Sequence, residues 1–148
     1  MVRQGIQVEG LRELLRALSR LPKTAQAEIR EAAQAIADDE AKRITAAGRS
    51  SDSQSAAAAG FVKARRDRVP TLSVGGSRKA GVSGGATVGQ LFFGAEFGGQ
   101  KRPTTRQFRP HKGRTGYWLW PVLRDDQERM LKRWQAAVEA IARDWERD

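Results

Sequence analysis

The residues that most often carry catalysis are sparse in this chain of 148 residues. It contains one histidine, His111, and no cysteine, which leaves little for a transition-metal site and excludes disulfides. His111 lies in a basic stretch, where a loop residue is a commoner role than a catalyst. Asp38, Asp39 and Glu40 are adjacent, so on a helix they point to different faces and form no convergent carboxylate site. We interpret these three acids as a solvated surface.

The motifs of common enzyme classes are also missing. No Gly-x-Ser-x-Gly elbow occurs, so nucleophilic serine chemistry has no support. The stretch "GGSRKAGVSGG" (75–85) is similar to a phosphate-binding loop but lacks the terminal Gly-Lys-Ser/Thr that places a lysine on phosphate. We therefore predict no catalytic residue, no metal ligand and no cofactor, and an enzyme is the minority interpretation.

Positive charge is concentrated in the middle of the chain. The net charge is +10, and residues 49–114 hold 13 Lys and Arg against three acids, while the remainder balances. Such polarisation indicates a polyanion or an acidic protein surface as a neighbour. Solubility and flexible basic loops are an equally weighted explanation. The basic residues lie mostly in Gly- and Ser-rich segments, which suits contact with phosphate better than readout of bases.

Length and hydropathy favour one soluble domain over residues 1–148. The first ten residues, "MVRQGIQVEG", lack the apolar core of a signal peptide. No run approaches the roughly 18 apolar residues that a membrane span needs. We expect a protein that is not exported and does not contact a membrane.

Two helices are predicted at the start, forming a hairpin. Residues 10–21 place five leucines on one face before Pro22 stops the helix. Residues 24–48 continue as a long Ala-rich helix with Thr24 as its N-cap and Gly48 as its C-terminal cap. A third long helix should begin at Pro121, because apolar residues then recur every three, four or seven positions. These are Leu123, Met130, Trp134, Val138, Ile141 and Trp145.

Between these helices we expect short strands and loops. Residues 49–60 are of low complexity and predict a flexible loop, as do residues 75–85. Residues 61–66 and 68–76 are typical of strands, and residues 86–99 are interpreted as strand material broken by glycines. The predicted fold class is α+β: a helical hairpin, a small, mainly antiparallel sheet with long basic loops, and a long C-terminal helix.

The run Tyr117-Trp118-Leu119-Trp120 is the most apolar four-residue stretch. In an extended segment these side chains alternate between two faces, and both faces are apolar. A small sheet on helices covers only one, so a neighbouring subunit is one candidate for the second cover, and a loop or helix of the same chain is the other. Four phenylalanines are interleaved with basic residues, as in single-strand binders, although core packing is the commoner role. They are Phe92, Phe93, Phe97 and Phe108.

The order of these elements resembles a known family. The chain starts with "VEGLRELLRALSRLPK", a long Ala-rich helix and a basic middle, and then "FGAEFGG" precedes "QFRPH" and a proline-started helix. This succession resembles the neck, or tail-completion, proteins that join head and tail in long-tailed, lambdoid-like phages. Residues 96–98 match the family's Glu-Phe-Gly stretch, and residues 108–110 match part of its Pro-Phe-x-Arg-Pro-like segment. The insertion "HKGRTGYWLW" before the helix departs from the family pattern.

The resemblance implies a structural virion protein assembled in the bacterial host cytoplasm. Such proteins form a homo-oligomeric ring, sixfold or twelvefold, between the connector or stopper and the tail-terminator or tail-tube proteins, around the DNA exit channel. Transient, sequence-blind contact with the genome or with acidic partners is expected from Arg65, Arg66, Arg68, Arg78 and Lys79. Subunit or partner contacts are expected from Phe92, Phe93, Phe97, Phe108, Arg109, Tyr117, Trp118 and Trp120. The alternative is a non-catalytic, nonspecific nucleic-acid-binding protein that uses the basic middle third.

Overall fold

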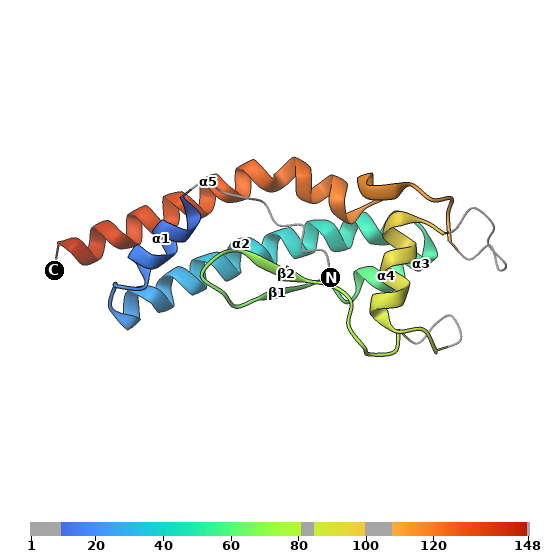
Figure 1. Ribbon diagram of the computed structural model, residues 1–148, viewed down its shortest axis with the longest axis horizontal. Coiled ribbons are helices and arrows are strands. Elements are labelled where there is room, and N and C mark those ends of the chain that lie inside the picture. The colour runs from blue at the N-terminus through green and yellow to red at the C-terminus, as the bar shows by residue number, and fades with distance from the viewer. Residues whose placement is uncertain (1–9, 81–84, 100–107, 148) are drawn as a thin grey trace.

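Two long helices form the frame of the molecule. The computed structural model describes residues 10–80, 85–99 and 108–147. Helices α2 (Lys23–Arg49) and α5 (Leu119–Glu146) lie side by side and run in opposite directions along the long axis (Figure 1). Helix α1 (Leu11–Leu18) lies at the end where α2 begins, whereas α3 (Ser53–Ala59) and α4 (Val88–Phe97) gather at the other end.

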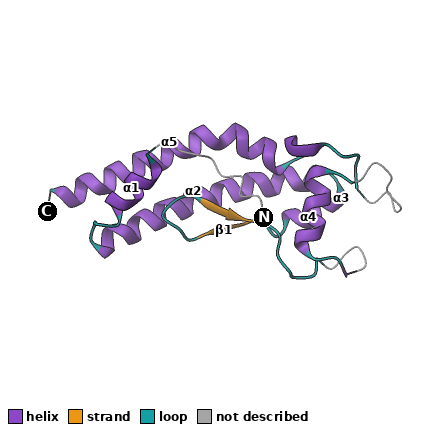
Figure 2. Cartoon of the chain, viewed as in Figure 1, coloured by secondary structure: helices purple, strands orange, loops and turns teal. Residues whose placement is uncertain are grey.

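A short hairpin completes the mixed α+β fold that the sequence predicts. Strands β1 (Lys63–Arg65) and β2 (Thr71–Ser73) pair antiparallel, with Ala64 opposite Leu72, and lie along α2 (Figure 2). A 3-10 turn, η2 (Gly113–Thr115), precedes α5. The strands predicted over residues 61–66 and 68–76 and the three predicted helices are therefore present, and α5 closes over the helical hairpin.

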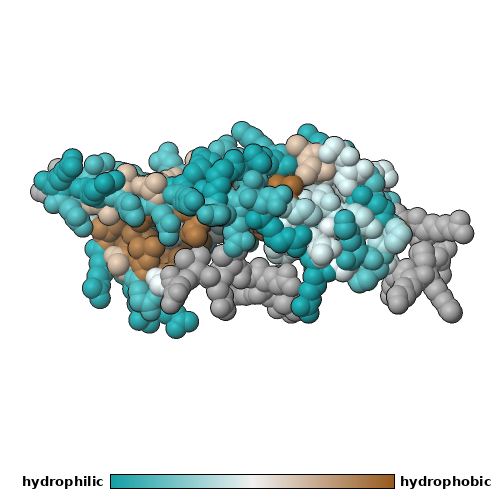
Figure 3. Space-filling view, turned by 90° about the horizontal axis from the view of Figure 1, so that it is seen from above, coloured by the Kyte–Doolittle hydropathy of each residue, from teal (hydrophilic) through white to brown (hydrophobic). Residues whose placement is uncertain are grey.

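The first of two apolar clusters lies between α2 and α5 at the end that carries α1. Ile29, Ala33 and Ile36 pack against Trp134 and Val138. The predicted leucine face of α1 covers this cluster through Leu18, which is buried, and through the partly buried Leu11, Leu14, Leu15 and Leu21. Figure 3 shows brown, apolar side chains gathered at this end, while the rest of the visible surface is mostly polar.

The second cluster joins four helices, and one of them replaces a predicted loop. Residues 53–59 form α3, whose N-cap Asp52 accepts a 2.8 Å hydrogen bond from the Ser55 amide. Ala58 and Ala59 are buried against α2 and α4. The prediction of a flexible loop over 49–60 is wrong, because an Asp cap followed by an alanine run is a strong local helix signal. Of the predicted loop 75–85, residues 81–84 lie outside the described residues.

Helix α4 replaces the strand predicted over residues 86–99. The Thr87 hydroxyl accepts a hydrogen bond from the Gln90 amide at 3.3 Å, and the Gln90 side chain accepts one from the Thr87 amide at 2.9 Å. This reciprocal capping box starts a helix that the Val and Phe content argued against. A Cβ at Gly94 would lie 2.6 Å from the Phe108 ring, so this glycine provides space for a neighbour.

The predicted ends of the long helices are off by two residues or fewer. Helix α2 begins at Lys23 after Pro22, so Thr24 is not its N-cap, and it runs to Arg49. Gly48 is therefore not a C-terminal cap but a buried helical residue. Helix α5 begins at Leu119, with Pro121 in its first turn, so residues 119 and 120 are helical and not extended.

Substitution of Gly48 tests how tightly α2 and α3 pack at their junction. A Cβ at this position would lie 2.6 Å from the Ala59 Cβ and 2.8 Å from the Trp118 ring. We expect Gly48→Ala to lower the free energy of unfolding by about 1–3 kcal/mol through overpacking, measured by urea denaturation. Gly60→Ala is the control: Gly60 has φ −63° and only the Ala57 carbonyl near its Cβ position, at 3.7 Å, so its stability should not fall. Equal losses in both variants would contradict this explanation.

Candidate functional site

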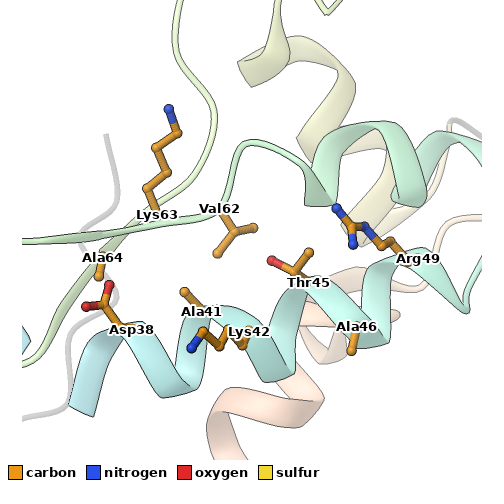
Figure 4. A pocket seen from close by; sticks show the side chains of 9 residues that line it. All are labelled: Asp38, Ala41, Lys42, Thr45, Ala46, Arg49, Val62, Lys63 and Ala64. Carbon is orange, nitrogen blue, oxygen red and sulfur yellow. The ribbon is translucent and has the colours of Figure 1, made fainter. Parts of the chain in front are cut away.

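An open groove with a basic rim runs between α2 and β1. It has a volume of about 710 Å³, and Figure 4 shows Lys42, Arg49 and Lys63 around it. Asp38 lies at one end and Thr45 in the middle. The floor is small and apolar, formed by Ala41, Ala46, Val62 and Ala64.

The cations of the groove are free of ion pairs in the described part of the chain. Among the residues that the structure describes, Lys42, Arg49 and Lys63 form no ion pair within 4.0 Å. By contrast, Arg43, on the same helix, donates to both carboxylate oxygens of Asp126 at 2.7 and 3.0 Å. Three cations against one carboxylate suit the binding of anionic groups, and a single carboxylate provides no acid–base pair.

The predicted basic contacts divide into exposed and anchored side chains. Arg65 and Arg66 are exposed, and Arg65 lies on the same strand face as Lys63 because side chains alternate along β1. Arg78 and Lys79 are exposed on the segment between β2 and α4. The predictions omitted Lys42 and Arg49, although they lie seven residues apart, two turns on one helical face.

Arg68 is held by the fold. Its guanidinium Nη1 donates to the Leu15 carbonyl at 3.4 Å, and its own carbonyl accepts from Trp134 Nε1 at 2.8 Å. The residue therefore links the β1–β2 turn to α1 and α5. Of the five predicted basic contacts, it is the one that packs into the structure.

The aromatic residues predicted to contact a subunit or partner also fall into a buried and an exposed group. Phe92 and Trp118 are only 7% and 2% exposed and meet edge to face in the core, with ring centroids 6.0 Å apart. Phe93 is 62% exposed and stacks on Phe97 with a centroid distance of 6.1 Å. Trp120 is partly buried. The same chain therefore covers Trp118, and the surface open to a partner is the Phe93 side of α4.

Arg109 is a central connection in the segment that precedes α5. Its guanidinium lies 3.8 Å from the centre of the Tyr117 ring, and its Nε lies 3.1 Å from an Asp52 carboxylate oxygen. It also donates to the hydroxyls of Ser51 and Ser55 at 2.8 and 3.3 Å. The Tyr117 hydroxyl donates to the Pro110 carbonyl at 2.6 Å. Arg109 thus fastens this segment to α3.

Glu96 caps α5 from another helix. Its side chain is 0% exposed, and its carboxylate accepts hydrogen bonds from the amides of Trp118, Leu119 and Trp120 at 3.2, 2.9 and 3.0 Å. The local N-cap, Trp118, has no side chain able to accept these bonds. Burial raises the pKa of Glu96 above its usual value, and the three amides and Arg124 oppose that rise. Sequence reasoning identified Glu96 only through a family motif and assigned it no cap.

A second buried acid lies between α2 and α5. Glu40 is 1% exposed, so its assignment to a solvated surface is wrong, whereas Asp38 and Asp39 are exposed as expected. Its nearest cationic atom is Arg129 Nη2 at 3.8 Å. Burial, and then the neighbouring Asp126, raise the pKa of Glu40 to about 7 despite Arg43 and Arg129. A protonated Glu40 can donate a hydrogen bond to Asp126. This carboxyl pair therefore contributes to the packing between α2 and α5.

Comparisons with models of known families, with curated proteins and with solved structures found no match. In the described part of the chain, no three His, Cys, Asp or Glu side chains come together as a metal site would require. Over the same residues, no helix has the length and apolarity to cross a membrane. The features that indicate a function are therefore the groove, the aromatic face of α4 and the exposed basic side chains.

Removal of the Glu96 carboxylate should destabilise the start of α5. We expect Glu96→Ala to lower the free energy of unfolding by about 2–4 kcal/mol, because three buried amides lose their acceptor. Glu96→Gln keeps one acceptor oxygen and should lose about half as much. Chemical denaturation measures both, and hydrogen exchange should reveal faster exchange at Leu119 and Trp120. A loss below 1 kcal/mol in Glu96→Ala would contradict the proposed role.

The raised pKa of Glu40 predicts a pH-dependent stability. Because it rises from 4.5 to about 7, the folded chain keeps a proton that the unfolded chain releases over this window. This contribution is complete below pH 4.5 and is lost as the pH rises through 7. Glu40→Gln should remove the dependence and be more stable than the parent at pH 8 by about 1–2 kcal/mol. Parallel unfolding curves for parent and variant from pH 4 to 8 would contradict this.

Proposed function

We propose that the chain is a non-catalytic structural subunit of the ring that joins head and tail in a long-tailed phage and surrounds the DNA exit channel. The resemblance of its sequence pattern to neck proteins motivates this proposal. The fold supports it through the order of its elements: a helical hairpin, a small sheet, a short helix that ends in Glu-Phe-Gly, and a long last helix.

The observation that carries the proposal is a pair of different surfaces, each left uncovered by the residues that the structure describes. One is the α4 surface around Phe93, which is 62% exposed and stacked on Phe97. The other is the basic groove between α2 and β1. A subunit of a closed ring needs two unlike surfaces, because each copy meets its two neighbours through different faces. An aromatic anchor and clustered arginine or lysine side chains suit such contacts.

The exposed cations support a sequence-blind role beside the channel. Arg65, Arg66, Arg78 and Lys79 are exposed, and none forms an ion pair within 4.0 Å among the described residues. They lie on a strand and a connecting segment and not on a helix that could enter a major groove. Such contacts attract phosphate without reading bases and weaken with salt, which permits a genome to move past.

The alternative is a nonspecific nucleic-acid-binding protein that works as a monomer. The same exposed cations favour it, and the aromatic face of α4 does not need to contact a subunit. The two functions differ in assembly. A monomer that binds duplex DNA with a steep salt dependence supports the alternative, and rings that form without nucleic acid support the neck.

Replacement of Phe93 tests the assembly. We expect the parent chain to form rings in negative-stain images and to associate with rising concentration in sedimentation velocity. Phe93→Ser should weaken this association at least tenfold, because an aromatic anchor is lost, yet change stability by less than about 0.5 kcal/mol. Circular dichroism of the variant provides the control for folding. A parent chain that remains monomeric and binds DNA would overturn the ring proposal.

A further inference from the structure

The groove presents its charges at a regular interval along α2. Lys42 and Arg49 both line the groove and are separated by seven residues. Seven residues make two helical turns, so the two side chains lie on one face, about 10.5 Å apart along the axis. Thr45 and Ala46 lie between them and leave this part of the face small. The Thr45 hydroxyl is already used, since it donates to the Ala59 carbonyl at 3.3 Å.

The last turns of α5 carry the opposite charges at the same interval. Glu139 and Glu146 are exposed, lie seven residues apart, and have the small Ala142 between them. Neither carboxylate has an ion-pair partner within 4.0 Å in the described parts of the chain. The helical repeat places Ala142 on one side of this pair and Arg143, four residues after Glu139, on the other, whereas Arg147 lies on a neighbouring face. This end of α5 therefore presents two carboxylates at the interval of the groove cations, bordered by a small residue on one side and an arginine on the other.

The two faces match in more than charge. With the helices parallel, Lys42 faces Glu139 and Arg49 faces Glu146. The same register brings Thr45 next to Ala142, and it leaves the small Ala46 opposite the longer Arg143 side chain. The same register places Gln135 beside Asp38, because each lies four residues before the first charge of its pair. The Gln135 amide can then donate to the carboxylate that would otherwise repel an acidic ligand.

The pairing cannot occur within one molecule. Arg43 pairs with Asp126, which aligns the groove with the start of α5. Ala142 lies about 24 Å further along α5 at ~1.5 Å per residue, and Figure 1 shows the end of α5 at one end of the long axis and the C-terminal half of α2 near the middle. A Lys and a Glu side chain together span much less than this distance. The occupant of the groove must come from another molecule.

We propose that the basic groove of one subunit binds the acidic end of α5, residues 135–146, from a second copy of this chain. The proposal rests on the ring function above and specifies one of its subunit contacts. Because the groove and the α5 end are different surfaces that lie apart on the molecule, each copy gives one and receives one, and the contact propagates head to tail.

The lining of the groove favours this helix over nucleic acid. About half of the lining residues are alanine or valine, which a phosphate backbone does not use, and no aromatic side chain is present on which a base could stack. Asp38 would repel a phosphate. The carboxylates of an amphipathic helix can pair with the cations of the rim, and its alanines can pack on the apolar floor.

Charge exchange tests the contact. Lys42→Glu with Arg49→Glu, and separately Glu139→Lys with Glu146→Lys, should each weaken self-association at least tenfold in sedimentation velocity. The quadruple variant, and an equal mixture of the two double variants, should regain association because opposite charges face each other again. Arg20→Glu with Lys23→Glu is the matched control; it makes the same charge change at two exposed residues outside the groove and should associate like the parent.

Cross-linking gives a second readout, because the chain has no cysteine of its own. Chains with Ala46→Cys, mixed with chains with Ala142→Cys, should give a dimer with a short bismaleimide. Ala140→Cys, exposed and about 100° around the helix from Glu139, should not replace Ala142→Cys. Equal cross-linking by both would overturn the proposed register.

The remaining outcomes separate this inference from the ring function. Rings that persist in both double variants would overturn the contact and leave the ring proposal standing. Loss of duplex DNA binding in Lys42→Glu with Arg49→Glu, not regained in the quadruple variant, would assign the groove to phosphate. A parent chain that neither associates nor cross-links at any concentration would overturn both proposals.

Discussion

The position of α5 depends on one buried carboxylate. Glu96, the residue before the end of α4, accepts hydrogen bonds from three consecutive amides at the start of α5. A helix start that is buried without acceptors is costly, and the local residue Trp118 cannot supply one. Because α5 forms half of the molecular frame, the direction of 28 residues is set by a side chain from another helix. Arg109 secures the same segment from the α3 side.

The two apolar clusters stabilise different parts of the α2–α5 pair by different means. Near α1, ordinary packing of leucine, isoleucine and tryptophan holds α2 to α5. Near α3 and α4, small residues and a few polar bonds bring four helices together around Trp118. Between these clusters lies the ionic layer of Glu40, Asp126, Arg43 and Arg129. Both candidate surfaces border the second cluster: Ala41 and Val62 of this cluster form part of the groove floor, and Phe93 projects from α4.

The periodicity of apolar residues predicted the long helices of this fold. The helices that it missed depend on local capping residues. The leucines of α1 and the repeat from Leu123 to Trp145 specified their helices because each buries one face. Helices α3 and α4 were missed because their signals were caps, Asp52 and the Thr87–Gln90 pair, in segments whose composition indicated a loop and a strand. Arg65, Arg66, Arg78 and Lys79 were predicted from charge density alone. Lys42 and Arg49 were not, because only the approach of β1 turns their helix face into a groove. The cap by Glu96 is equally invisible, since the contact spans more than twenty residues.

The antiparallel pairing of α2 and α5 has a consequence for synthesis of the chain. The whole of α3, the hairpin and α4 are translated between the two helices. While the ribosome makes them, the apolar stripe of Ile29, Ala33 and Ile36 can be covered by the leucines of α1 and, once it has been made, by Val69. Trp134 and Val138, the α5 residues that pack on this stripe, are made last, so premature association through the stripe is the hazard that α1 limits.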